Sequence, residues 1–130
     1  SKHDFYRLLR EPEVDRLSLS AMTGAVQGGA VCVDLRSEEE YSESHLAGAV
    51  NLPLGLLAIT SRLLHEQVPY ICYCDTGRRS RAAAYLLKQR GYNAVALDDC
   101  RALFNDPDRA SFLERGSNYL LRQGRATPGQ

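Results

Sequence analysis

The sequence carries no net charge and no long apolar run, and both absences limit what the chain can bind. Its 16 basic and 16 acidic residues cancel over 130 residues, which gives no support to a strongly basic surface for nucleic acid. No stretch approaches the roughly 18 apolar residues of a membrane-spanning helix. We therefore expect neither a nucleic-acid partner nor a membrane partner.

Cysteine is scarce, and its spacing lacks the pattern of a zinc site. The sequence contains Cys32, Cys72, Cys74 and Cys100, and no two of them stand at the Cys-x2-Cys spacing. No secretory segment is recognisable at the start, so a disulfide framework is not expected in a domain of this size. These features predict a protein of the reducing cytoplasm in which at least one cysteine has a chemical role.

Length and hydrophobic pattern predict one domain of alternating strands and helices. Strands are expected in apolar runs at residues 14–17, 30–35, 50–52, 70–73 and 94–97. Helices are expected at residues 4–10, 18–27, 37–44, 55–67, 81–90 and 111–123. This order favours an α/β fold with a mainly parallel sheet of about five strands and helices on both faces. Its core would cover about 14–104, after a helical lead-in at 1–12 and before a flexible tail at 124–130.

The stretch "CDTGRRS", which begins at Cys74, holds the strongest chemical signal. Cys74 follows an apolar strand, and the carboxyl ends of parallel strands are where such folds bind ligands. A thiol at the start of a helix, beside cations, should lose its proton more easily than a free cysteine. Gly77 permits a tight curl of amides around the sulfur, and Ser80 can cap the following helix. Arg78 and Arg79 add positive charge, so the pattern predicts a nucleophile that attacks an anionic substrate.

Two stretches taken together resemble a known family. The segments "VCVDLRSEEEYSESHLAGAVNLP" and "YCDTGRRS" resemble the rhodanese-like sulfurtransferase domain, over about residues 18–97. Family members carry an apolar strand ending in Asp-x-Arg, an acidic helix, a Gly-His-Ile-x-Gly-Ala turn, Asn-x-Pro and a loop that begins with the catalytic cysteine. The resemblance implies a single rhodanese-like domain. The matching residues are Asp34, Arg36, Glu40, His45, Gly48, Ala49, Asn51, Pro53 and Cys74.

The resemblance also implies sulfur transfer through a persulfide of Cys74. The cysteine would take a sulfane sulfur from a small anionic donor such as thiosulfate and hand it to an unknown thiol or protein acceptor. The two arginines of the loop would favour a doubly charged donor. No metal and no organic cofactor is expected. The residues that would hold the negative persulfide are Asp75, Thr76, Gly77, Arg78, Arg79 and Ser80.

Other residues are expected to support the structure. Asp34 and Arg36 would form a polar pair that ties the strand end to neighbouring loops. His45 would make structural hydrogen bonds in its turn and is not expected to bind a metal. Cys32 and Cys72 lie within apolar strands and are interpreted as inert core residues.

Some positions depart from the family pattern. Ser44 stands where the family usually has glycine, so the turn there is expected to have a different shape. Asp98-Asp99-Cys100 stands where the family often has a Gly-Gly pair, and no tryptophan is present, so the nearby wall of the site is expected to differ too. We interpret Cys100 as a core or surface residue, with a resolving thiol as the alternative. The acidic run at 38–40 is interpreted as a solvated helix face.

Two other functions remain open. A phosphatase or arsenate reductase of the same fold needs Cys-x5-Arg, whereas Cys74 to Arg79 is Cys-x4-Arg, a shorter ring that suits one sulfur atom better than a phosphate. A non-catalytic rhodanese-like module is the second, although such modules usually lack the cysteine. The lead-in "FYRLLREP" also resembles rhodanese domains attached behind a cyclic-nucleotide-binding domain, and Ser1 in place of methionine agrees with a piece of a longer protein.

Overall fold

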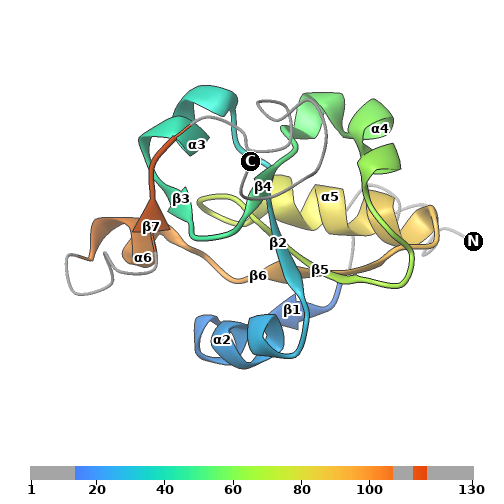
Figure 1. The fold of residues 1–130 in the computed structure, drawn as a ribbon, viewed down its shortest axis with the longest axis horizontal. Helices are drawn as coiled ribbons and strands as arrows, with labels where there is room; N and C mark the ends of the chain where they lie inside the picture. The colour runs from blue at the N-terminus through green and yellow to red at the C-terminus, as the bar shows by residue number, and fades with distance from the viewer. Residues whose placement is uncertain (1–13, 107–112, 117–130) are drawn as a thin grey trace, which may run out of the picture.

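A five-stranded sheet forms the centre of the computed structural model, which describes residues 14–106 and 113–116. Its strand order is β1-β6-β5-β2-β4, and each neighbouring pair is parallel. The longer strands occupy the middle of the sheet, and the five parallel strands predicted from the sequence are confirmed (Figure 1). The strands are β1 (Arg16–Leu17), β2 (Val31–Asp34), β4 (Val50–Asn51), β5 (Pro69–Tyr73) and β6 (Asn93–Leu97).

Helices cover both faces of this sheet, as the alternating pattern predicts. Figure 1 shows α2 below the strands and α5 above them. Side chains along β5 alternate between two cores, so that Cys72 packs under α5 and Ile71 packs over α2. Leu57 of α4 joins the first core, and Leu103 of α6 joins the second. The helices are α2 (Leu19–Gln27), α4 (Leu57–Thr60), α5 (Arg78–Gln89) and α6 (Arg101–Asn105).

The acidic helix α3 (Glu38–Glu43) begins with the capping box that its sequence predicts. The Ser37 Oγ accepts the Glu40 amide at 3.2 Å, and Glu40 Oε1 accepts the Ser37 amide at 3.1 Å. Ser44 follows the helix with φ of −170°, an extended conformation that any residue adopts. The turn therefore does not require the glycine that the family usually has there.

Helix α5 begins earlier than the predicted helix at 81–90. Gly77, with φ of 100°, directly precedes its first residue, Arg78. Ser80 consequently lies inside the first turn, where its hydroxyl donates to the carbonyl oxygen of Gly77 at 3.0 Å. The capping role predicted for Ser80 is wrong, because the left-handed glycine starts the helix. At the other end Gly91 has φ of 90°, as expected for a residue that terminates a helix.

The helix predicted at 55–67 is present as three short turns. They are η1 (Leu54–Leu56), α4 and η2 (Ser61–Leu63), which follow one another directly. Arg90 Nη1 donates to the carbonyl oxygen of Ala58 at 2.8 Å and to Ser61 Oγ at 2.9 Å. Arg90 thus contacts both α4 and η2.

A second, two-stranded sheet was not predicted from the sequence. β3 (His45–Leu46) pairs antiparallel with β7 (Leu113–Glu114). The final helix predicted at 111–123 is therefore wrong at residues 113 and 114, which form a strand. Two-residue strands contain no readable period, and their pairing joins residues far apart in the chain.

Several predictions concern segments outside the described residues. These are the lead-in at 1–12 with its helix at 4–10, the tail at 124–130 and most of the range 111–123. Within residues 14–106 and 113–116, no helix has the length and apolar character needed to cross a membrane.

Candidate active site

Cys74 lies at the carboxyl edge of the main sheet, between the end of β5 and the start of α5. Tyr73, the last residue of β5, pairs in register with Asp34, the last residue of β2. This is the edge at which parallel α/β sheets bind ligands, so the fold places the predicted nucleophile where its strand position indicated. The Cys74 side chain is 1% exposed, so that little of the sulfur meets solvent.

Two backbone amides and one hydroxyl group contact the Cys74 sulfur. The Gly77 amide donates to Sγ at 3.2 Å and the Ser80 amide at 3.3 Å. The Ser80 hydroxyl oxygen lies 3.4 Å from the same sulfur. The first amides of a helix have no partner within that helix, so they are available to an external anion. This arrangement can stabilise a negative charge on the sulfur.

The loop needs glycine at position 77 because its φ of 100° lies in the left-handed region. A Cβ atom there would also stand 2.8 Å from Arg81 Nη1, the end of a side chain that can shift. The Arg81 guanidinium therefore lies against the loop one helical turn beyond it. The sequence analysis assigned Arg81 no role, and its position four residues after the glycine was the available signal.

Arg79 points to two acidic side chains. Its guanidinium donates to Glu40 Oε1 at 2.8 Å and to Oε2 at 3.1 Å, and it lies 3.4 Å from Asp75 Oδ1. The hydrogen bond from Arg79 is the main cause that lowers the pKa of Glu40 to about 2. The interpretation of Glu40 as part of a solvated helix face is thus wrong. The motif contained Glu40, but no local pattern indicated a partner so far along the chain.

The other predicted loop residues have different surroundings. The Thr76 amide donates to Asp75 Oδ1 at 2.7 Å, so it is engaged within the loop. The backbone carbonyl of Asp75 accepts the Cys100 amide at 2.8 Å, which ties the loop to the segment after β6. Arg78 is exposed at the first position of α5. Of the predicted ring of amides, those of Gly77 and Ser80 contact the sulfur.

A buried ion pair closes the neighbouring end of β2. Arg36 binds both carboxylate oxygens of Asp34, with Nη2 at 2.8 Å, and also donates to the Ser44 carbonyl oxygen. Its guanidinium lies 4.2 Å from the centre of the Phe104 ring. Although burial opposes the charged form, the hydrogen bond and attraction of Asp34 raise the pKa of Arg36. Asn51 donates to the backbone carbonyls of both partners at 2.9 Å.

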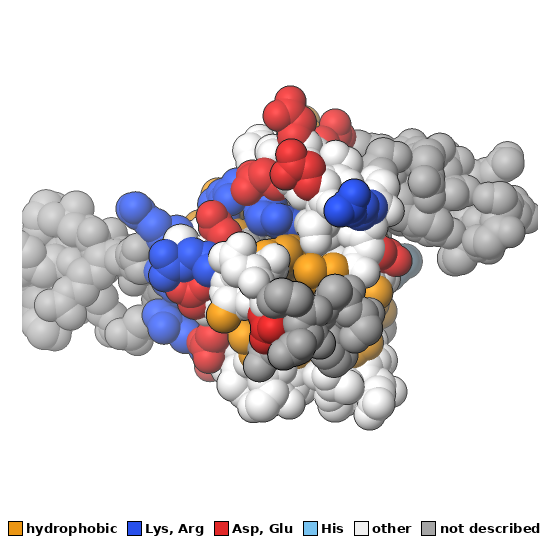
Figure 2. All heavy atoms as spheres, turned by 90° about the vertical axis from the view of Figure 1, so that its left-hand side faces the viewer, with side chains coloured by type: hydrophobic (Ala, Val, Ile, Leu, Met, Phe, Trp, Pro, Cys, Tyr) orange, Lys and Arg blue, Asp and Glu red, His pale blue; other side chains and the backbone are white. Residues whose placement is uncertain are grey.

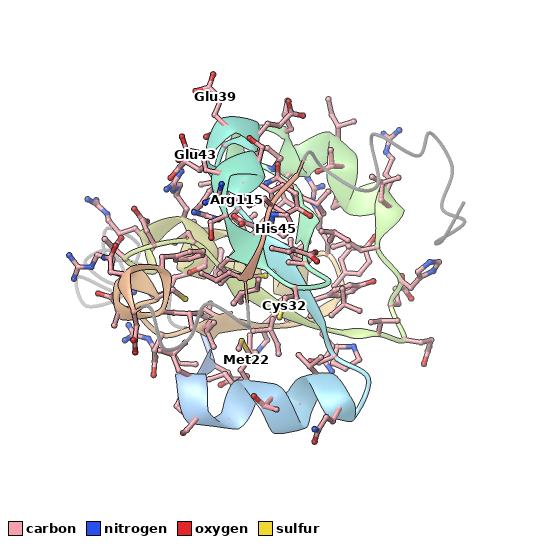
Figure 3. The ribbon with its side chains drawn as sticks, turned by 60° about the vertical axis from the view of Figure 1, so that its left-hand side comes forward. Met22, Cys32, Glu39, Glu43, His45 and Arg115 are labelled. Atoms are coloured by element: carbon pink, nitrogen blue, oxygen red, sulfur yellow. The ribbon has the colours of Figure 1, made fainter. Side chains whose placement is uncertain are left out.

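His45 joins α3 to the small sheet. Its ring stacks on Tyr41 with centroids 3.6 Å apart, and Nδ1 lies 2.7 Å from the Tyr41 carbonyl oxygen. Nε2 lies 3.0 Å from Glu114 Oε1, which also accepts the Gly48 amide at 3.0 Å. Figure 3 shows His45 between α3 and the strands of the sheet. Sequence reasoning missed Glu114, because β7 was expected to be helical.

The other three cysteines are buried thiols. Burial raises the pKa of Cys32 to about 11 and the pKa values of Cys72 and Cys100 to about 12. Figure 3 shows Met22 of α2 pointing toward Cys32, and both belong to one apolar core. The Cys100 thiol donates to the Asp98 carbonyl oxygen at 3.2 Å. All three therefore differ from a reactive surface thiol.

Among the described residues, the charged and metal-binding side chains near this edge form no metal site. On the face shown in Figure 2, acidic and basic side chains lie next to one another. Among the residues that the structure describes, no group of three or more His, Cys, Asp or Glu side chains could hold a metal ion. The chemistry available at this edge is that of a thiol held by backbone amides.

Residues 17–99 match the protein family described as Rhodanese-like domain. A tRNA sulfurtransferase of Thermoplasma acidophilum is 30% identical over 96 residues, which are 70% of this chain and 19% of that protein. A thiosulfate sulfurtransferase of Escherichia coli is 32% identical over 65 residues, which are 48% of this chain and 62% of that protein. The chain thus spans less than two thirds of the length of either relative.

Solved structures show the same fold. A rhodanese-like domain protein of Staphylococcus aureus has a TM-score of 0.67, with 79% of this chain and 99% of that chain covered at 19% identity. A thiosulfate sulfurtransferase of Pseudomonas aeruginosa has a TM-score of 0.65, with 82% of this chain and 20% of that chain covered at 19% identity. The family match extends over more than half of the sequence, and sulfurtransferases are among the relatives. The chain therefore belongs to the family of rhodanese-like domains.

Proposed function

We propose that the chain is a sulfurtransferase that carries a sulfane sulfur as a persulfide of Cys74. One observation carries this proposal: the Gly77 and Ser80 amides both donate to Cys74 Sγ, at 3.2 and 3.3 Å. Hydrogen-bond donors aimed at one atom favour negative charge on it, and the Cys74 thiolate carries its charge on that atom. Family membership supports the same class of reaction.

The proposed reaction has two displacement steps. The Cys74 thiolate attacks the sulfane sulfur of thiosulfate, a sulfur–sulfur bond forms, and sulfite leaves with the electron pair of the broken bond. A nucleophilic acceptor then attacks the outer sulfur of the persulfide and regenerates the thiolate. With cyanide as the acceptor, the product is thiocyanate. The protein supplies the nucleophile and the fixed amides that stabilise its thiolate charge.

A small anionic donor suits the site better than a bulky one. Cys74 is 1% exposed, so little of its sulfur is accessible to a donor. Arg78 is exposed at the start of α5, where a cation can attract an anion to the helix end. Arg79 is bound by Glu40 and Asp75, so its charge is largely balanced. Arg79 on its own is therefore a weak attractor of the donor.

The acceptor would be a thiol or a protein, reached in a reducing compartment such as the cytoplasm. The four cysteines are free thiols, and such thiols persist under reducing conditions. A phosphatase reaction fits less well, because Ser80 stands where Cys-x5-Arg requires arginine, and Arg79, one of the two arginines beside it, faces carboxylates. The match covers 19% of the tRNA sulfurtransferase of Thermoplasma acidophilum, which is consistent with a domain that works within a larger protein.

Intact-mass measurement after treatment with thiosulfate tests the proposal. The wild-type chain should gain one sulfur atom, and added thiol should remove it. Cys74→Ser should gain none while keeping its fold, and Cys72→Ser, which changes the neighbouring buried thiol, should still be loaded. A wild-type chain that stays unmodified, or a Cys74→Ser variant that gains sulfur, would contradict the proposal. Turnover of an aryl phosphate in place of sulfur loading would favour the phosphatase.

A further inference from the structure

Arg79 connects the start of α5, which holds the amides around the Cys74 sulfur, to α3, the helix that follows β2. Its guanidinium forms two hydrogen bonds with the Glu40 carboxylate, at 2.8 and 3.1 Å. Two parallel hydrogen bonds fix the relative orientation of both groups, which a single contact would not do. Glu40 belongs to α3 and Arg79 to α5, so this pair ties the starts of two helices together.

The position of Arg79 in the chain makes this tie relevant to the sulfur. Gly77 lies two residues before Arg79, and Ser80 lies directly after it. Those two residues provide the amides that contact Cys74 Sγ. A constraint on the Arg79 side chain therefore limits movement of the first turn of α5, and with it the direction of both amides.

Glu40 is itself held in place. Its backbone amide donates to Ser37 Oγ, and its Oε1 accepts the Ser37 amide, so the capping box restrains the side chain from both ends. Ser37 directly follows Arg36, which is fixed in the buried ion pair with Asp34 at the end of β2. The carboxylate that binds Arg79 is consequently anchored to the central sheet.

We propose that Glu40 is a positioning residue for sulfur transfer, which acts through Arg79 to keep the Gly77 and Ser80 amides directed at the Cys74 sulfur. This inference rests on the proposed function, because it assigns Glu40 to the reaction of the same thiol. Glu40 touches neither the sulfur nor the two amides, so its influence passes through the arginine.

Charge and position lead to opposite expectations for Glu40. If the carboxylate acted through charge alone, its removal would leave Arg79 less balanced, and a more positive loop would favour both the thiolate and an anionic donor. If the carboxylate acts by position, its removal loosens the amides and disfavours the thiolate. The direction of the change therefore separates the two mechanisms.

Glu40→Gln is the central variant. Glutamine at this position preserves the capping box and removes the ion pair with Arg79. We expect the rate of Cys74 alkylation by iodoacetamide, a neutral reagent, to fall roughly three- to tenfold at pH 7, and its pH profile to move to higher pH. Glu39→Gln is the matched control, because Figure 3 shows Glu39 pointing away from the sheet on the same helix. Cys74→Ser gives the background of the other thiols.

Two further variants show whether the effect passes through Arg79. Glu40→Asp retains the charge and shortens the reach, so positioning predicts a slower reaction, whereas charge alone predicts the wild-type rate. In an Arg79→Gln background, Glu40→Gln should have no additional effect. Thermal melts followed by circular dichroism establish that the compared variants are folded.

Three results would overturn the inference: an unchanged or faster reaction of Glu40→Gln, an equal loss in Glu39→Gln, or the full Glu40→Gln effect without Arg79. Alkylation needs no sulfur donor, so this measurement is independent of persulfide formation. A chain that takes up no sulfur from thiosulfate would refute the proposed function, while the alkylation profiles would still decide the role of Glu40.

Discussion

The environment of Cys74 depends on two residues that side-chain chemistry alone would not single out. Gly77 has φ of 100°, a region that costs other residues about 1–2 kcal/mol, and an added Cβ would contact Arg81. Ser80 has no exposed surface, and both its amide and its hydroxyl contact the sulfur. The loop thus reaches the sulfur because one residue has no side chain and the other has a very short one.

Replacing Ser80 with alanine tests the contribution of the hydroxyl. The Ser80 hydroxyl accepts the Cys74 thiol at 3.4 Å and donates to the Gly77 carbonyl oxygen. Once the thiol is ionised, the hydroxyl must turn to donate to the sulfur. We expect Ser80→Ala to slow sulfur uptake from thiosulfate by about tenfold, because such a hydrogen bond to a charged group is worth roughly 1.5–3 kcal/mol and the Ser80 amide remains. Single-turnover mass spectrometry would measure the rate. Ser42→Ala is the control, since its hydroxyl also donates to the carbonyl three residues earlier, at 3.0 Å. Equal rates in wild type and Ser80→Ala would show that the amides suffice.

At the scale of elements, the small sheet holds β7 against the turn that follows β3. Glu114 is the link, because its Oε1 accepts from Gly48 and contacts His45. Leu113 packs against the core that contains Met22 and Leu103, so the pairing also covers apolar surface. These contacts join the last described strand to the region around α3.

Glu114→Ala should lower the free energy of unfolding by about 1 kcal/mol, since buried His45 and exposed Gly48 lose one shared partner. Urea unfolding followed by circular dichroism measures this change. Asp15→Ala removes the exposed pair with Lys88 and should change stability by no more than a few tenths of a kcal/mol. Equal effects of the two substitutions would mean that Glu114 makes no special contribution to the fold.

Elements with a repeated pattern were predictable from sequence, and elements made by distant contacts were not. β2, β5 and β6 are apolar except for Asp34 at the end of β2 and Asn93 at the start of β6, and α3 carries its cap signal in Ser37 and Glu40. The location of Cys74 at a strand end follows from the same pattern. The tie from Glu40 to Arg79 did not, because it depends on how α3 and α5 meet in space. β7 was not predicted for the same reason, because it pairs with β3, which is far away in the chain.

For the whole molecule, acid should weaken the tie between α3 and α5. Hydrogen bonding from Arg79 holds the pKa of Glu40 at about 2, below its ordinary value, so the folded state binds fewer protons than the unfolded chain between these values. Stability from this pair is present above pH ~4.3 and is lost as the pH falls through about 2. Because the Glu40 side chain is 38% exposed, we expect this part to be no more than about 1 kcal/mol.

Urea unfolding at several pH values tests this expectation. The stability difference between wild type and Glu40→Gln should be largest near neutral pH and should shrink as the pH approaches 2. Glu39→Gln should show no comparable dependence on pH, because the Glu39 side chain points away from the sheet (Figure 3). A stability difference that stays constant from neutral pH to pH ~2 would mean that Glu40 does not act through the ionisation of its carboxylate.

The outer strands of the described sheet, β1 and β4, are only two residues long each. A strand from another molecule that docked at either margin would find few free backbone groups with which to form a ladder. Because the edge strands are so short, the central apolar strands are protected from pairing with strands of other molecules. Charged residues along the edges are not needed for this protection. Lengthening β4 by design should make the domain more prone to fibril-like association at high concentration.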